Sequence, residues 1–298
     1  MEGASFSDAT SRIETVPGAG GLPRIAVSNP LATADIYLHG AQVASWRPAG
    51  QRDVLWMSPR SHFTPGKAIR GGVPICWPWF SAHPTDPALP SHGFARLRDW
   101  RVERAEAQAD GSSVIELSLE SDAASLAMWP HSFRATYRVV IGARLEMTLA
   151  VENRSGQEAV LSEALHSYFA VGDVRRCTVT GLQGRSYRDR STGPTPAIQG
   201  QSALAFAGET DRVYLATTDT CTIEDPVHRR RITIAKSGSE STVVWNPWTD
   251  RARELTDLGE DAWPGMLCVE TANAGEHSVR VPAGGRHEMS ATFSVAAI

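Results

Sequence analysis

Hydrophobic and polar residues alternate with a period of two along much of the chain. In residues 132–140, apolar side chains at every second position are separated by arginine and threonine, and residues 144–152 repeat this pattern. Such alternation is typical of strands that bury one face and expose the other. The two stretches meet at Ile141, Gly142 and Ala143, so we predict a β-hairpin.

The same alternation recurs in residues 114–120, 229–236 and 286–295. Clusters of glycine, serine and asparagine separate the alternating stretches, and no segment has the longer period of an extended amphipathic helix. Many short strands divided by turn residues are typical of antiparallel sheets. We therefore predict an all-β protein.

The sequence predicts one domain preceded by a tail. Residues 1–22 are rich in glycine and serine and are expected to be a flexible N-terminal tail. Residues 23–298 contain no interior linker or repeat, so we expect a single domain, a size that all-β sandwiches reach. Residues 82–93 contain too many prolines for a strand and predict a surface loop.

The net charge and the cysteine content indicate which binding partners and which cellular compartment to expect. The 298 residues carry a formal net charge of -4, so no basic excess favours nucleic acid or a membrane surface. The four cysteines lack paired spacing, which favours free thiols in a reducing compartment. The N-terminus lacks the basic start and apolar core of a signal peptide. We predict a cytoplasmic protein.

One carboxylate has an unusual context. Glu270 directly follows the apolar run of residues 266–269 and has no polar neighbour on that side. Burying an unpaired carboxylate is costly. Glu270 is therefore expected to have either a partner or a chemical role.

Three further stretches carry candidate site residues. Arg70 precedes two glycines, and a guanidinium beside such a turn suits a phosphate or carboxylate, although a structural turn is the simpler reading. His92 and Arg96 flank a glycine at the end of the proline-rich loop. His166 lies in an apolar stretch, where an isolated histidine is more often a satisfied core residue than a catalyst.

Several classes of site lack support in the sequence. Cys76, His83 and His92 are separated by proline-rich gaps unlike the short paired spacings of zinc sites, so no metal is expected. The chain also lacks a phosphate-binding glycine loop before a helix and a G-x-S-x-G motif. Neither a nucleotide nor an acyl-enzyme is therefore expected.

Six motifs occur in a fixed order: IRGGVPICWPWF, HGFARLRDW, LHSYFAVGDV, DRVY, VVWNPW and CVETANA. Together they resemble those of the D-hexose-6-phosphate mutarotases, in the aldose 1-epimerase superfamily, from about residue 24 to the C-terminus. This resemblance implies a large antiparallel β-sandwich of the galactose mutarotase type. It also implies an isomerase that acts without a metal or an organic cofactor.

The resemblance also assigns roles to individual residues. The catalytic pair of the family matches His166 and Glu270. Its substrate-binding arginines match Arg70 and Arg96, and an aspartate that would hold sugar hydroxyls matches Asp211. These matches replace the structural readings of Arg70 and His166.

Three other positions have weaker assignments. His92 is expected to contact the sugar ring, with a structural role as the alternative, and Lys67 could assist the arginines. Some relatives have a glutamine where this chain has Ser91, so Ser91 is given no role.

The reaction implied is the interconversion of α and β anomers of a hexose 6-phosphate, with glucose 6-phosphate as the expected substrate. Opening and reclosing a hemiacetal requires one general base and one general acid. Arginines that hold the phosphate would fix the anomeric carbon against that pair. We accordingly expect a small sugar phosphate as the only partner, no nucleic acid, no membrane and a monomeric protein.

Three rival functions remain open on the sequence. The first is a mutarotase for unphosphorylated aldoses, which would share the acid and base but lack the anion site. The second is a carbohydrate-binding module without catalysis. The third is a glycoside hydrolase, although that chemistry usually needs two facing carboxylates and only Glu270 stands out.

Overall fold

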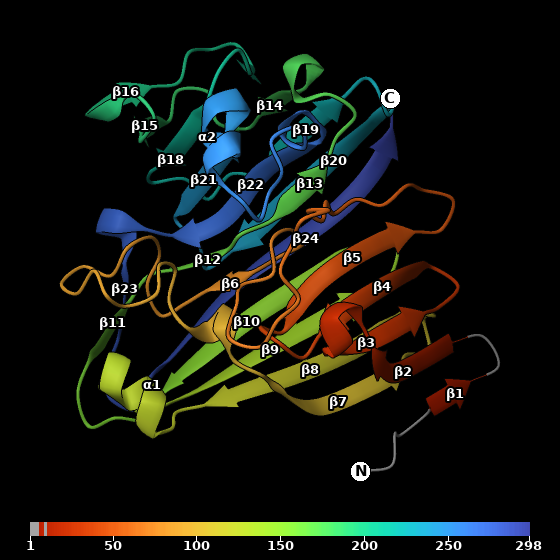
Figure 1. The fold of residues 1–298 in the computed structure, drawn as a ribbon, viewed down its shortest axis with the longest axis vertical. Helices are drawn as coiled ribbons and strands as arrows, with labels where there is room; N and C mark the ends of the chain where they lie inside the picture. Colours follow the sequence, from red (N-terminus) through yellow and green to blue (C-terminus); the bar gives the residue numbers. More distant parts are fainter. Residues whose placement is uncertain (1–5, 9–10) are drawn as a thin grey trace.

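The computed structural model of the chain describes residues 6–8 and 11–298. Strands account for 48% and helices for 10%, which confirms the all-β class. Within the described residues the strands form four sheets, and the strand pairs in them are antiparallel (Figure 1).

The largest sheet has nine strands in the order β17-β14-β19-β20-β24-β10-β9-β8-β7. Its centre contains the predicted hairpin, in which Leu145 lies opposite Ile141. The other three alternating stretches fall on β8, β20 and β24. The strands are β7 (Arg101–Ala107), β8 (Ser113–Glu120), β9 (Phe133–Ile141), β10 (Leu145–Asn153), β14 (Thr178–Thr180), β17 (Leu204–Ala205), β19 (Cys221–Asp225), β20 (Arg230–Ser237) and β24 (Arg286–Ala297).

A second sheet has eight strands, seven of them in the order β16-β15-β18-β21-β22-β12-β6, and β13 also pairs with β22. Its central strand β22 is buried along its whole length. The strands are β6 (Ile75–Cys76), β12 (Glu163–Leu165), β13 (Tyr168–Ala170), β15 (Ser186–Asp189), β16 (Gly193–Ile198), β18 (Thr210–Tyr214), β21 (Ser241–Asn246) and β22 (Met266–Asn273).

Two smaller sheets and a few short helices complete the fold. One sheet orders β1 (Phe6–Asp8), β2 (Ser11–Pro17), β3 (Pro23–Ser28), β4 (Ala32–Tyr37) and β5 (Gln42–Pro48) consecutively, and the other pairs β11 (Ala159–Leu161) with β23 (Val279–Val281). The α-helices are α1 (Ala123–Met128) and α2 (Trp248–Glu254). The 3-10 helices are η1 (Ala19–Gly21), η2 (Ala95–Leu97), η3 (Val174–Arg176), η4 (Trp263–Gly265) and η5 (Gly275–His277).

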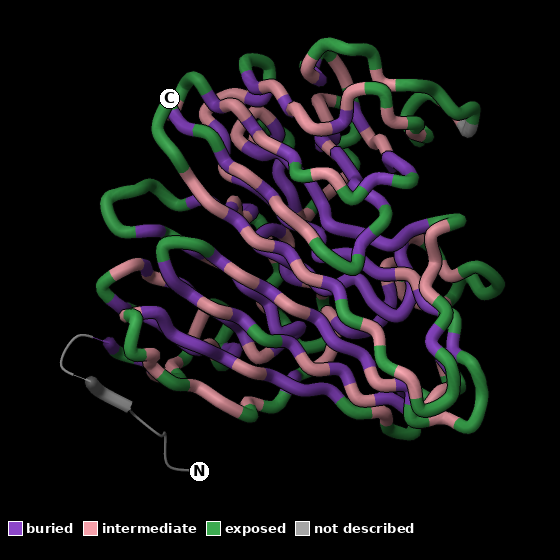
Figure 2. The backbone as a smooth tube through the Cα atoms, turned by 180° about the vertical axis from the view of Figure 1, so that it is seen from behind, coloured by how far each residue is buried: buried purple, intermediate pink, exposed green. Residues whose placement is uncertain are grey.

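The two large sheets pack against each other through apolar side chains. Phe169 on β13 meets Phe293 on β24 with ring centroids 4.9 Å apart. Along β24, Met289, Ala291 and Phe293 are fully buried while the residues between them are partly exposed. Figure 2 shows this alternation of buried and less buried residues along the strands. The packing confirms the β-sandwich that the family resemblance implied.

Part of the predicted N-terminal tail is structured instead. β2 pairs with β3 from Arg12 to Pro17, and Ile13 is buried in the main core. Backbone hydrogen bonds and the burial of one apolar side chain thus hold a segment of a tail that was predicted to be flexible from its overall glycine and serine content. Residues 1–5 and 9–10 of the tail lie outside the described residues. The single domain over residues 23–298 stays a prediction.

Other expectations concern loops, thiols and location. Residues 82–93 contain no strand and are largely exposed, as predicted. The four cysteines are buried free thiols. In the described part of the chain, no helix is both long and apolar enough to span a membrane. The compartment and the oligomeric state stay predictions.

Candidate active site

Strand register places His166 opposite Glu270. β12 pairs with β22 so that Leu165 faces Thr271, and β13 pairs with the same strand so that Tyr168 faces Cys268. The register is the same on both sides of the short gap between β12 and β13, so His166 falls opposite Glu270. The His166 Nδ1 and Glu270 Oε1 atoms are 3.4 Å apart.

Glu270 lies on the face of β22 that is turned away from the nine-stranded sheet. Side chains alternate between the two faces of a strand, and Asn273 contacts Met289 of β24. Leu267 and Val269 share the face of Asn273 and pack in the main core. The apolar run before Glu270 therefore anchors the strand, while the carboxylate is directed to the opposite face and is 1% exposed.

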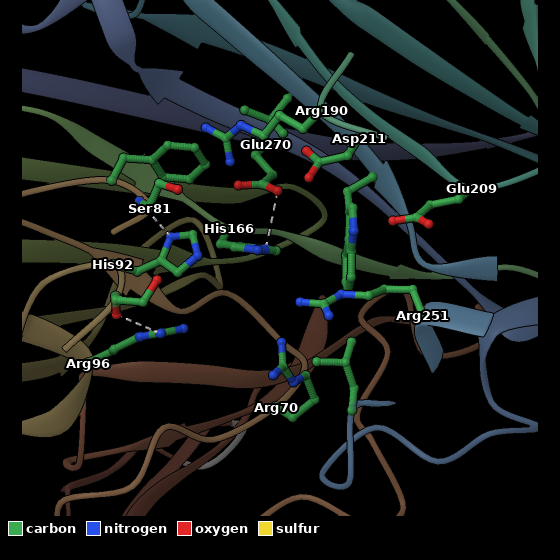
Figure 3. Close-up of a pocket in the computed structure, with 15 residues that line it drawn as sticks. Arg70, Ser81, His92, Arg96, His166, Arg190, Glu209, Asp211, Arg251 and Glu270 are labelled. Carbon is green, nitrogen blue, oxygen red and sulfur yellow. Dashed lines mark hydrogen bonds and ion pairs between the residues drawn. The ribbon is translucent and has the colours of Figure 1, made fainter. Parts of the chain in front are cut away.

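A cavity of about 430 Å³ covers this face and brings together all six residues expected to form the site. Figure 3 shows Glu270 and His166 pointing toward each other inside it. The lining residues are Arg70, Phe80, Ser81, Ser91, His92, Arg96, His166, Arg190, Glu209, Asp211, Val243, Trp245, Arg251, Leu255 and Glu270.

Burial shifts the pKa values of Glu270 and His166 in opposite directions. Desolvation, followed by the nearby Asp211 carboxylate, raises the pKa of Glu270 well above its ordinary value. Desolvation, followed by His92 and the cavity arginines, lowers the pKa of His166 well below its ordinary value. The carboxylate is thereby a stronger proton acceptor, and the imidazolium a stronger proton donor, than in water.

Aromatic rings fix the orientation of the His166 imidazole. Tyr168 stacks on it with ring centroids 4.7 Å apart and an interplanar angle of 7°. Trp245 meets the same imidazole edge-on at 6.0 Å. The backbone N–H of His166 donates to the carbonyl of Pro74. The ring is therefore held from one face and one edge, with its Nδ1 directed at Glu270.

Arg70 is held by residues that the sequence did not single out. Its Nε and Nη2 donate to the two carboxylate oxygens of Asp257, each at 3.1 Å, and its Nη1 donates to the Tyr168 hydroxyl at 3.0 Å. This bidentate pairing pre-organises the guanidinium at the edge of the cavity. Because Tyr168 also stacks on His166, one side chain connects the arginine with the histidine.

His92 and Arg96 lie together at the end of the proline-rich loop. The Ser81 N–H donates to His92 Nδ1 at 3.2 Å, and burial followed by the charge of Arg96 lowers the pKa of His92. His92 is thus a neutral ring that keeps its proton on Nε2. Arg96 Nη2 donates to the Ser91 carbonyl at 2.9 Å. Both side chains line the cavity, as the resemblance implied.

Asp211 enters the cavity from β18. It pairs across the strands with Trp245 of β21, which in turn pairs with Cys268 of β22. Burial is the main cause of the raised pKa of Asp211, and Arg190 opposes it. Asp211 is therefore a second partly desolvated carboxyl group near Glu270.

Three charged lining residues were not anticipated. Arg190 follows β15 and has its guanidinium carbon 5.2 Å from the centre of the Phe80 ring. Glu209 precedes β18, and Arg251 lies on α2. Each belongs to a stretch rich in charged and turn residues, so no local pattern separates these residues from ordinary surface charges. Lys67, a candidate helper of the arginines, does not line the cavity.

One set of side chains has the donor atoms of a metal site. Ligand atoms of His166, Cys268 and Glu270 all lie within 4.8 Å of one another, and the three residues are buried. Cys268 and Glu270 share a face of β22 because they are two positions apart. The sequence did not group Cys268 with His166, because they are about a hundred residues apart and meet only through strand pairing.

Solved structures first define the class of this fold. A crystal structure titled as a "putative mutarotase" from Salmonella typhimurium has a TM-score of 0.90 and 30% identity, covering 100% of this chain and 97% of that one. A second, of HI1317, has a TM-score of 0.80 and 27% identity, covering 99% of this chain and 100% of that one. The fold is that of the mutarotases.

The sequence comparisons then give the family. The model of the family described as aldose 1-epimerase matches residues 23–294. A relative from Escherichia coli strain K12, named "Putative glucose-6-phosphate 1-epimerase", is 35% identical over 255 residues, 86% of this chain and 84% of the relative. One from Cenchrus ciliaris with the same name is 35% identical over 247 residues, 80% of this chain and 74% of the relative. The chain belongs to the aldose 1-epimerase family.

Proposed function

We propose that the protein interconverts the α and β anomers of a hexose 6-phosphate, with glucose 6-phosphate as the substrate. The observation that carries the proposal is the 3.4 Å approach of His166 Nδ1 to Glu270 Oε1 in the wall of the cavity. This approach supports the proposal, because a proton donor and a proton acceptor side by side in the cavity wall could both act on one bound sugar. The names of the relatives from Escherichia coli and Cenchrus ciliaris support the same reaction.

The proposed reaction moves one proton at each end of the bond that breaks. Glu270 accepts the proton of the C1 hydroxyl while His166 donates a proton to the ring oxygen. The bond between C1 and the ring oxygen breaks, which leaves an open-chain aldehyde. Rotation about the C1–C2 bond presents the other face of the carbonyl, and the two residues exchange roles as the ring closes.

The arginines of the cavity support a phosphorylated substrate. Four arginines line the cavity against three carboxyl groups, Glu209, Asp211 and Glu270. Guanidinium groups suit phosphate because they present several donors in one plane. We assign Arg70 and Arg96 to the phosphate, which fixes C1 against the catalytic pair.

The remaining expected residues hold the sugar ring. Asp211 would accept hydrogen bonds from sugar hydroxyls, and the neutral His92 would donate one from Nε2. Trp245 offers a flat apolar surface beside them. A carbohydrate-binding module without catalysis would have no need of the facing donor and acceptor.

The Glu270→Gln variant tests the catalytic assignment. Glutamine keeps the size and the hydrogen bonding but cannot accept the proton, so we expect anomer exchange to fall by about 10²- to 10⁴-fold. The variant should still bind glucose 6-phosphate, as measured by calorimetry. Glu209→Gln is the matched control, because it removes a cavity carboxylate to which we give no proton transfer. Full activity of the Glu270→Gln variant would remove Glu270 from the mechanism.

A further inference from the structure

We propose that His166, Cys268 and Glu270 form a binding site for a thiophilic divalent cation of the zinc type, and that this cation inhibits the enzyme. The cation would be an inhibitor and not a cofactor of the reaction. The inhibitory half of this inference rests on the proposed function, whereas cation binding does not.

The geometry fits a tetrahedral centre. Zinc bonds to nitrogen and oxygen of about 2.0 to 2.1 Å give a tetrahedral nitrogen-to-oxygen separation of about 3.4 Å. The His166 Nδ1 and Glu270 Oε1 atoms are 3.4 Å apart. The ligand atom of Cys268 lies within 4.8 Å of both others, so the three side chains surround one position for a cation.

Two of the three ligands have unused donor atoms. Among the described residues, His166 Nδ1 and Glu270 Oε2 are buried without a hydrogen-bond partner. Their residues are 7% and 1% exposed. Unsatisfied polar atoms at such depth are uncommon and need an explanation. A cation bound to His166 Nδ1 and to both carboxylate oxygens of Glu270 would satisfy Nδ1 and Oε2 at once.

The charges of the ligands also match a divalent cation. A thiolate from Cys268 and a carboxylate from Glu270 neutralise two positive charges, so the filled site carries no net charge into a buried environment. The thiolate selects zinc over magnesium and calcium, which prefer oxygen ligands. His166 and Glu270 line the cavity, so an exchangeable fourth ligand can come from that side.

Occupation of this site would block the reaction. The cation would hold the lone pair of His166 and the carboxylate of Glu270, so neither could take part in proton transfer. Sugar phosphate and cation would then compete for the same cavity. A chelator would restore activity, because none of the ligands is chemically altered.

The test measures cobalt and zinc binding separately from activity. Cobalt(II) added to the apoprotein should give a near-ultraviolet absorption band of a cobalt–thiolate bond, and zinc should displace it. Zinc should also slow anomer exchange competitively with glucose 6-phosphate, reversibly with a chelator, whereas magnesium at the same concentration should not.

The Cys268→Ala variant isolates the thiol. It should lose the cobalt band and require about 100-fold more zinc for inhibition, because even changes beyond the direct ligands cost 10- to 100-fold in affinity. Its exchange rate without zinc should match the wild type. Cys221→Ala is the matched control, since Cys221 is also buried but lies on β19 of the nine-stranded sheet.

Two outcomes would overturn the inference. One is the absence of a cobalt band in the wild-type protein. The other is equal zinc inhibition of the wild type and the Cys268→Ala variant. If the cobalt band is present but the protein has no anomerase activity, the cation site stands and the proposed function fails.

Discussion

His166 and Glu270 acquire their chemistry from where the strands place them. The same burial that raises the pKa of the Glu270 carboxyl group lowers the pKa of the His166 imidazole. When two groups interact this closely, the protons belong to the pair. The proposed reaction uses the single-proton form of the pair, from the arrangement in which that proton lies on His166 and Glu270 is a carboxylate. The single-proton form is favoured over a wide pH range. A second proton must go to His166, whose pKa is lowered, and the last proton must leave Glu270, whose pKa is raised.

The pH profile of turnover tests this account of the pair. The pair should take up a second proton, on His166, only well below pH 6.5, the ordinary pKa of histidine. It should lose its last proton, from Glu270, only well above pH 4.5, the ordinary pKa of glutamate. We therefore expect kcat to show no acid limb near pH 6.5. The measurement needs saturating substrate, because the phosphate group itself titrates near pH 6. It also needs a chelator, which keeps the proposed inhibitory cation off His166 and Glu270. An acid limb with its midpoint at 6.5 would contradict the account.

The residues of the site differ in how far the sequence could predict them. His166 and Glu270 stand in motifs that the family resemblance identifies, and the structure brings them together. Asp257, Arg190 and Arg251 lie in charged stretches without such a motif. Asp257 is 187 positions from the arginine that it holds, and only the completed fold reveals such a pairing.

At the scale of elements, hydrophobic alternation was sufficient where a strand has one buried face. The hairpin of β9 and β10 and the long strand β24 follow directly from it. The strand β22 is buried on both faces and shows no alternation. Its neighbouring strands could therefore not be predicted from the local sequence. β2 was missed because the glycine- and serine-rich tail around it was read as a whole, although β2 itself contains Ile13, Thr15 and Val16.

The turn between His92 and Phe94 is an element on which two site residues depend. Gly93 has a φ of +73°, and a Cβ atom there would lie 2.0 Å from the Trp77 carbonyl oxygen. The same oxygen accepts the N–H groups of Phe94 and Ala95. The backbones of Trp77 and Gly93 thus lie too close together to leave room for a side chain at position 93. This contact positions His92 and Arg96.

We expect Gly93→Ala to lower the free energy of unfolding by about 1 to 3 kcal/mol, the cost of a strained backbone position. It should also raise the KM for glucose 6-phosphate, because the turn carrying His92 and Arg96 must shift. Urea denaturation and steady-state kinetics measure the two effects. Gly208→Ala is the control, since a Cβ there meets no atom within 4 Å. An unchanged stability and KM of the Gly93→Ala variant would refute this role of the turn.

At the scale of the whole molecule, one face of the eight-stranded sheet forms the core and the other face carries the candidate site. One face of the eight-stranded sheet packs on the nine-stranded sheet, where Phe169 meets Phe293. The other face carries His166, Asp211 and Glu270 under the loops that close the cavity. The site is therefore assembled on a rigid, well-packed sheet from segments distant in sequence. The class of fold was predictable from periodicity, whereas this division between the two faces required the pairing of distant strands.

The central claim is that the molecule combines an acid–base pair with an anion site for a sugar phosphate. Exchange between the α and β anomers, followed by NMR on glucose 6-phosphate and on free glucose or galactose, tests it most directly. The account predicts strong acceleration for glucose 6-phosphate and little for the free sugars. Equal acceleration of both kinds of sugar, or none for the phosphate, would contradict it.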